Sequence, residues 1–118
     1  MKLSLGVFVS QSGETKDLHR ILQMFQKKGF PTFGIVNVVG SLIAKETDFG
    51  CYMNAGSEQS VPSTKSFLCS IVCQVLLSLW YAHHKHGEKF LFVRQKICFA
   101  LLALNCFIGK FLFQNKIL

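Results

Sequence analysis

The stretch LGVFVSQSGET, at residues 5–15, decides the fold of this chain. Its first five residues form a short apolar run with β-branched side chains, which is typical of a buried parallel strand. The hydroxyl- and glycine-rich turn that follows opens a helix. The hydroxyls of Ser10, Ser12 and Thr15, together with free N–H groups at the helix start, could hold a phosphate. Serine also caps helices that bind no ligand, so the turn by itself leaves both interpretations open.

Strands and helices alternate beyond this stretch. We expect strands at 5–9, 32–37 and 49–53, a helix at 14–28, a short helical turn at 40–47 and a long helix over about 63–82. This order predicts right-handed crossovers and a parallel α/β sheet. Ligands bind at the carboxyl ends of the strands in such sheets. The turn at 10–15 and the hydroxyls of Ser63 and Thr64 both fall at such places, so they should meet in one crevice.

Two apolar helices are expected in the second half of the chain. Residues 67–82 contain no charge, but polar residues recur at every fourth position from Ser66 to Ser78 and form a stripe. This run is shorter than the roughly 20 residues that a bilayer span requires. A second apolar run, at 97–109, is shorter still and ends at Lys110. A membrane hairpin made of these two helices is a further interpretation. The polar stripe and the short apolar runs argue against it, so we expect no membrane association.

Charge and cysteine content limit the function further. The net charge is +7, and seven of the thirteen basic residues lie in 61–118. They are scattered, without an arginine cluster or an aromatic-basic motif, so we expect no nucleic-acid partner. The five cysteines form no Cys-x-x-Cys pair and most lie in apolar runs. Free thiols of this kind are typical of a reducing compartment, and no secretory signal is evident, which predicts the cytoplasm.

Four later segments of the sequence form a longer motif pattern together with the turn at 10–15. They are GIVNVVGS at 34–41, ETD at 46–48, NAG at 54–56 and VPSTK at 61–65. Together with the turn they closely resemble the sugar isomerase (SIS) domain, and within that family the first SIS domain of glutamine–fructose-6-phosphate aminotransferases. The resemblance is strong over 5–65 and rests on helix spacing alone over 66–112, which leaves 113–118 as a tail. It implies one partial SIS domain over 5–112.

The resemblance implies both a fold and a binding site. The fold would be α/β, three-layered, with a parallel flavodoxin-like sheet that lacks its first strands, followed by two long helices. The strand at 5–9 would then be an unpaired apolar edge. The residues that match the family's sugar-phosphate site are Ser10, Gln11, Ser12 and Thr15 for the phosphate, and Val61 and Ser63 for the sugar. Pro62 replaces a small residue of the family pattern, removes one N–H and could crowd the sugar.

The resemblance also indicates which functions to expect. The family's glutaminase domain, second SIS domain and C-terminal tail have no counterpart in this sequence, so we expect a fragment without catalysis, cofactor or metal. The first interpretation is a module that binds fructose 6-phosphate or glucosamine 6-phosphate, from an enzyme of hexosamine and UDP-N-acetylglucosamine synthesis. The second is a non-catalytic remnant that acts by association, either with a full-length aminotransferase subunit or as a homo-oligomer.

Several other residues have a plain interpretation beside a functional one. Glu14 is expected to be a carboxylate in the first turn of its own helix, where the helix dipole stabilises it, rather than a general acid. His83, His84 and His86 are expected to form a basic helix end rather than a metal cluster. Cys69 and Cys73 are expected to be buried thiols rather than ligands of a soft metal. For Lys65, contact with a substrate and coverage of apolar surface stay equally open.

Overall fold

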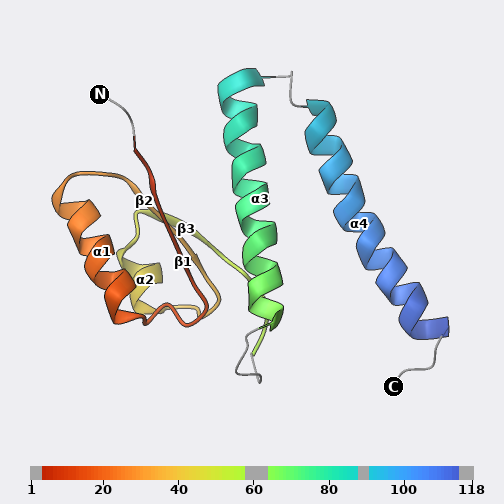
Figure 1. The fold of residues 1–118 in the computed structure, drawn as a ribbon, viewed down its shortest axis with the longest axis horizontal. Coiled ribbons are helices and arrows are strands. Elements are labelled where there is room, and N and C mark those ends of the chain that lie inside the picture. The colour runs from red at the N-terminus through yellow and green to blue at the C-terminus, as the bar shows by residue number, and fades with distance from the viewer. Residues whose placement is uncertain (1–3, 58–63, 88–90, 115–118) are drawn as a thin grey trace. The chain divides into compact units, whose positions relative to one another are not determined.

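The computed structural model describes residues 4–57, 64–87 and 91–114, and the side chains of these residues up to 103 (Figure 1). Its elements are β1 (Gly6–Ser10), α1 (Lys16–Lys27), β2 (Thr32–Val36), α2 (Leu42–Glu46), β3 (Phe49–Tyr52), α3 (Thr64–His86) and α4 (Leu91–Gln114). The chain forms two compact units, Met1–Val75 and Leu76–Leu118, and the boundary between them falls within α3. The expected order of strands and helices is confirmed, with element ends shifted by a few residues.

The three strands form one parallel sheet in the order β1-β2-β3. This arrangement confirms the predicted α/β class, and it places β1 at an edge of the sheet. The expectation that this first strand is buried is wrong for one of its faces. Gly6, Phe8 and Ser10 are buried, but the alternate residues Leu5 and Val7 are 47% and 43% exposed. Side chains alternate between the two faces of a strand, and only one face of β1 is fully covered.

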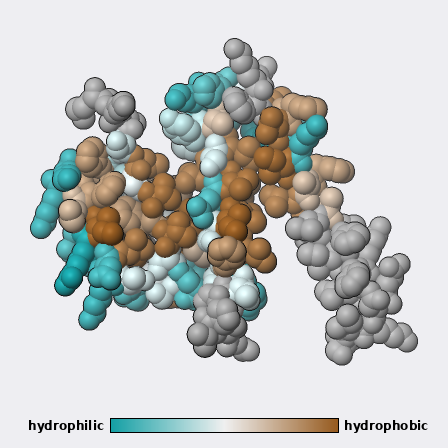
Figure 2. All heavy atoms as spheres, in the orientation of Figure 1, coloured by the Kyte–Doolittle hydropathy of each residue, from teal (hydrophilic) through white to brown (hydrophobic). Residues whose placement is uncertain are grey.

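The core of the first unit lies between the sheet and the helices α1 and α2. Phe8, Leu22, Val36 and Ile43 are each at most 3% exposed and form one apolar cluster. Phe25 packs against this cluster, and its ring meets that of Phe8 edge to face, with centroids 5.6 Å apart. Burial of such side chains contributes roughly 1.5–3 kcal/mol each. The polar residues of α1 face outward and appear as a teal surface in Figure 2.

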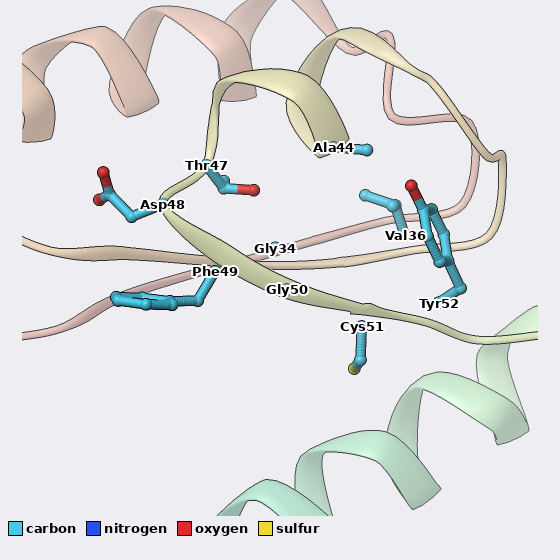
Figure 3. A pocket seen from close by; sticks show the side chains of 9 residues that line it. All are labelled: Gly34, Val36, Ala44, Thr47, Asp48, Phe49, Gly50, Cys51 and Tyr52. Atoms are coloured by element: carbon cyan, nitrogen blue, oxygen red, sulfur yellow. The ribbon is translucent and has the colours of Figure 1, made fainter.

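The other face of the sheet is on the side of α3, and the residues of this helix are less regularly buried. Cys51 of β3 points to this side, toward α3 (Figure 3). Within the first half of α3, Ser66 and Ser70 are buried, whereas Phe67 and Leu68 are 62% and 63% exposed. The polar stripe of the sequence is therefore not a single solvated face, because its first two members are buried and the next two, Gln74 and Ser78, are exposed. Figure 2 shows apolar residues along much of α3.

The amino end of the sheet is held by a reciprocal pair of residues. The backbone N–H and the hydroxyl of Thr32 both donate to Asp48 Oδ2, at 2.9 and 2.7 Å. The N–H of Asp48 donates in turn to Thr32 Oγ1, at 3.1 Å. The hydrogen bonds from Thr32 lower the pKa of Asp48 from its ordinary value of 3.8. These contacts fasten the start of β2 to the start of β3.

Helix α3 extends further than its uncharged run. It has 23 residues and, among the residues that the structure describes, is the one helix long and apolar enough to cross a membrane by length and composition. The uncharged run at 67–82 is only a part of this helix, so the length of that run does not by itself decide whether the helix could span a bilayer. Core helices of soluble proteins pass the same test, so the helix alone does not indicate a membrane protein.

Candidate functional site

The turn at 10–15 connects β1 to α1 and is held by its own hydroxyls. Ser10 Oγ accepts a hydrogen bond from the N–H of Gly13 at 3.0 Å and lies 3.4 Å from Thr15 Oγ1. Ser12 Oγ accepts a hydrogen bond from the N–H of Glu14 at 3.2 Å. The structure thus brings Ser10, Ser12 and Thr15 together in one short turn. Gln11 lies in the same turn and is half-buried.

This turn faces the N-terminus of a 12-residue helix. Thr15 is the N-cap residue of α1, but its hydroxyl makes no capping hydrogen bond to the helix. The first N–H groups of any α-helix have no partner within the helix and carry a partial positive charge. Thr15 is exposed and Ser12 is half-buried, while Ser10 is buried. The turn can therefore offer the hydroxyls of Ser12 and Thr15, together with backbone N–H groups, to an anion.

Two contacts hold the turn against the start of α2. The carbonyl oxygen of Gly13 accepts a hydrogen bond from the N–H of Ile43 at 3.0 Å. Glu14 Oε1 accepts one from the N–H of Leu42 at 2.9 Å. The expectation for Glu14 is thus wrong, because its carboxylate lies at the N-terminus of the neighbouring helix rather than in the first turn of its own. A carboxylate is favoured there by the unpaired N–H groups of that helix end.

Gly13 is required for this close approach. Its φ is 69°, in the left-handed region that glycine adopts without strain. A Cβ atom at this position would lie only 2.0 Å from Ser41 Oγ. The Ser41 side chain is itself buried, and its Oγ has no hydrogen-bond partner among the described residues. Gly13 therefore lets the turn pack directly on Ser41.

Asn37 connects the turn to a second loop, and the sequence analysis gave it no role. Its N–H donates to the carbonyl of Gln11 at 3.2 Å. Its side chain accepts from the N–H of Ala55 at 2.9 Å and donates to the carbonyl of Gly56 at 2.8 Å. The signal available in the sequence is an asparagine directly after the carboxyl end of a strand. Its three hydrogen bonds place the loop at 54–56 beside the turn at 10–15.

The sugar-binding residues expected from the resemblance cannot be placed in this arrangement. Val61 and Ser63, and with them Pro62, lie outside the described residues. Lys65 is described, and its Nζ donates to the carbonyl of Ser57 at 2.9 Å. This contact fastens the start of α3 to the loop that precedes it.

A cavity of about 190 Å³ lies over β3, away from the expected site residues. Figure 3 shows its lining, which includes Gly34, Val36, Thr47, Asp48 and Tyr52. The hydroxyl of Thr47 already donates to the carbonyl of Ile43 at 2.9 Å, and Asp48 is bound to Thr32. The hydroxyl of Thr47 and the carboxylate of Asp48 are thus engaged in the fold, and the turn at 10–15 is the better candidate for a ligand.

Comparison with known proteins adds a family to this geometry. The family model described as SIS domain matches residues 2–79. Over 102 residues the chain is 43% identical to a glutamine–fructose-6-phosphate aminotransferase (isomerizing) of Tropheryma whipplei strain Twist, and this match covers 86% of the chain. Over 74 residues it is 48% identical to such an enzyme of Arabidopsis thaliana, covering 63% of the chain. The matches span only 16% and 11% of these two relatives.

A solved structure supports the same relationship at the level of the fold. The chain is similar to a protein of Clostridium difficile 630 that is described as a phosphosugar isomerase, with a TM-score of 0.73 and 26% sequence identity. The match covers 95% of this chain and 34% of that one.

Proposed function

This chain belongs to the SIS domain family, and on that premise we propose that its turn at residues 10–15 binds the phosphate of a sugar phosphate, fructose 6-phosphate or glucosamine 6-phosphate. The observation that carries the proposal is the position of Thr15. It is the N-cap residue of α1, yet its hydroxyl makes no capping bond, and the residue is exposed at the end of a turn that also contains the half-buried Ser12. A phosphate at this helix end would meet both hydroxyls and the unpaired N–H groups.

Each residue of the turn has a distinct part in the proposed site. The hydroxyls of Ser12 and Thr15 donate to phosphate oxygens, and the first N–H groups of α1 add further donors. Ser10 is buried and accepts from the N–H of Gly13, so it shapes the turn and holds Thr15 in place. Gln11 contributes its side chain from the same turn. Val61 and Ser63 would contact the sugar, as the resemblance implies.

The reaction that the full-length aminotransferases catalyse is not assigned to this chain, because the chain matches only 11–16% of their length. We propose that residues 5–112 form a partial SIS domain that binds and orients the sugar phosphate and supplies no catalytic residue. Its place would then be in hexosamine and UDP-N-acetylglucosamine synthesis, in the cytoplasm. Neither a nucleic acid nor a membrane is part of this proposal.

A second function is favoured by one specific observation. Leu5, directly before β1, and Val7, on β1, are exposed, and β1 is an edge strand of the described sheet. An apolar sheet edge is a ready surface for pairing with another chain. The chain could act by association with a full-length aminotransferase subunit or with a second copy of itself. Co-purification of tagged chain with such a subunit, and its loss in Val7→Lys, would favour this function.

The binding proposal is tested by calorimetric titration of the purified full chain with fructose 6-phosphate. We expect saturable binding that weakens at least about tenfold in Ser12→Ala/Thr15→Ala, since each lost hydrogen bond to a charged group costs about 1.5–3 kcal/mol. Ser57→Ala, on an exposed loop outside the turn, is the matched control and should bind as the wild type does. Circular dichroism verifies that each variant is folded.

Two outcomes would contradict the proposal. One is a folded wild-type chain that binds neither fructose 6-phosphate nor glucosamine 6-phosphate. The other is equal binding by the wild type and the double variant, which would move the site away from the turn. Titration with inorganic phosphate separates the two halves of the ligand, because phosphate alone should compete at the turn without any sugar contact.

A further inference from the structure

The turn at 10–15 offers hydrogen-bond donors to a phosphate but no full positive charge. It contains no lysine or arginine, and its one charged side chain, Glu14, accepts from the N–H of Leu42. Lys16 follows the turn directly, but it shares the first turn of α1 with Asp17, whose negative charge offsets it. A phosphate monoester carries a charge of about −1.5 to −2 at neutral pH. The site proposed above, on which this inference rests, therefore lacks a cation that balances its ligand.

Lys65 lies at the start of α3, where a cation is ordinarily unfavourable. It is the second residue of this helix, whose first turn contains no acidic residue. The N-terminus of a helix carries a partial positive charge, so a lysine at this place is repelled by its own helix. An anion bound beside the ammonium would remove this repulsion.

The side chain of Lys65 reaches back from α3 to the loop that follows β3. Its Nζ donates to the carbonyl of Ser57 at 2.9 Å. Asn37, which follows β2, binds the backbone of the two preceding residues of this loop at 2.9 and 2.8 Å. The N–H of Asn37 donates in turn to the carbonyl of Gln11 in the turn at 10–15. A continuous series of contacts thus connects the ammonium to the turn, along the carboxyl ends of the three strands.

The ammonium is placed so that a ligand can bind it. Lys65 is exposed, and its contact with Ser57 is to a neutral carbonyl oxygen. An ammonium has three donors, of which this carbonyl uses one. A phosphate oxygen is a stronger acceptor than a carbonyl because it carries charge. The flexible stem of lysine lets the ammonium turn toward such an acceptor.

We propose that Lys65 supplies the positive charge that balances the phosphate of a sugar phosphate bound at the turn. Its ammonium donates to one phosphate oxygen, while the hydroxyls of Ser12 and Thr15 and the first N–H groups of α1 donate to the others. The start of α3 thereby becomes part of the site, joined to the turn through Asn37. The lysine acts in binding and takes no part in a reaction.

The test is calorimetric titration of the full chain with fructose 6-phosphate at low salt. We expect Lys65→Met to weaken binding about three- to tenfold because it removes a charge-assisted hydrogen bond, and Lys65→Arg to restore most of the affinity because it keeps the charge. Lys27→Met is the matched control, since it removes the same charge in the last turn of α1, at the end of that helix away from the site. It should bind as the wild type does. Circular dichroism verifies that each variant is folded.

Salt and inorganic phosphate separate a charge contact from a structural one. At about 0.5 M sodium chloride the difference between the wild type and Lys65→Met should shrink to less than about twofold, because salt screens exposed charges. Inorganic phosphate should lose affinity by the same factor as fructose 6-phosphate, since the ammonium meets the phosphate and not the sugar. A lysine that only fastens α3 to its loop would instead lower the thermal midpoint, and the loss of affinity would not depend on salt.

The outcomes separate this inference from the binding proposal. Equal binding by the wild type and Lys65→Met, with weak binding by Ser12→Ala/Thr15→Ala, would keep the site at the turn and overturn the role of Lys65. A loss in Lys16→Met but not in Lys65→Met would assign the charge to α1, and a loss that salt does not change would leave Lys65 a structural role only. A folded wild type that binds no sugar phosphate would overturn both proposals. Lys65→Gln, which keeps a donor without the charge, repeats the test where Lys65→Met does not fold.

Discussion

The two faces of the three-stranded sheet are packed in opposite ways. On the face covered by α1 and α2, Phe8, Leu22, Val36 and Ile43 form a nearly solvent-free cluster. On the side of α3, the buried residues of the helix include Ser66 and Ser70, and Phe67 and Leu68 are largely exposed. One helix layer thus completes its core within the described residues, while the other turns apolar side chains outward.

The difference shows that an apolar sequence does not decide which side of a helix is buried. α1 carries polar and apolar residues on separate faces, so its orientation follows from its pattern. α3 carries only a stripe of mostly small polar residues, two of which, Ser66 and Ser70, are buried, so its pattern does not predict which side faces the solvent. Exposed apolar surface of this kind commonly marks a place where another chain or domain packs.

The sharpest test of this comparison is a pair of truncations, one on each side. Ile43→Ala should lower the free energy of unfolding by about 2–5 kcal/mol, because it leaves a cavity in the core. Phe67→Ala should change it by less than about 0.5 kcal/mol, since the ring is exposed. Urea denaturation of both variants measures the two values. Equal losses would mean that α3 is covered in solution and would remove the contrast between the faces.

A second test concerns the junction between the turn and α2 on the well-packed face. Gly13→Ala should cost about 1–3 kcal/mol, because the residue has a positive φ and its Cβ would collide with Ser41. Adding Ser41→Gly should restore part of the loss by removing the collision, while the backbone strain stays. Denaturation of the single and double variants separates the two contributions. No recovery in the double variant would show that strain alone is responsible.

The smallest expected effect is on the pH dependence of stability and comes from Asp48 and Thr32, at the starts of β3 and β2. The pKa of Asp48 is lowered by its hydrogen bonds from Thr32, so the folded state favours the carboxylate. The stability that this provides is present above the unfolded pKa near 3.8 and is lost as the pH falls below it. The thermal midpoint of the wild type should therefore fall more steeply in acid than that of Asp48→Asn. Parallel curves would assign the acid sensitivity to other carboxyl groups.

Much of the architecture could be predicted from local pattern. The apolar run at 5–9, the glycine-rich turn and the helical spacing at 14–28 each specify an element from neighbouring residues, and all three elements are present. Ser10, Ser12 and Thr15 could be grouped as site candidates because they are close in sequence. Their role in binding stays a prediction, and Val61 and Ser63 lie outside the described residues.

The contacts that hold the candidate site in place could not be predicted from local sequence pattern. Glu14 binds the N–H of Leu42, which is 28 positions away, and Asn37 binds residues of the loop 18 and 19 positions beyond it. His19 illustrates the same limit, because its Nε2 lies 2.7 Å from Oε2 of Glu46, which is 27 positions away in the sequence. Such pairs depend on how strands and helices are placed in space.

The sequence by itself determined the types and order of the elements, the parallel sheet and the family resemblance, because periodicity and turn residues act over a few positions. Only the tertiary structure decided that Glu14 accepts a hydrogen bond at the start of a neighbouring helix and that Asn37 links two loops. It also decided that Ser66 and Ser70 of α3 are buried while Phe67 is exposed. The physical reason is that a stripe of small polar residues does not by itself fix which side of a helix is buried, and the surface that the helix packs against does.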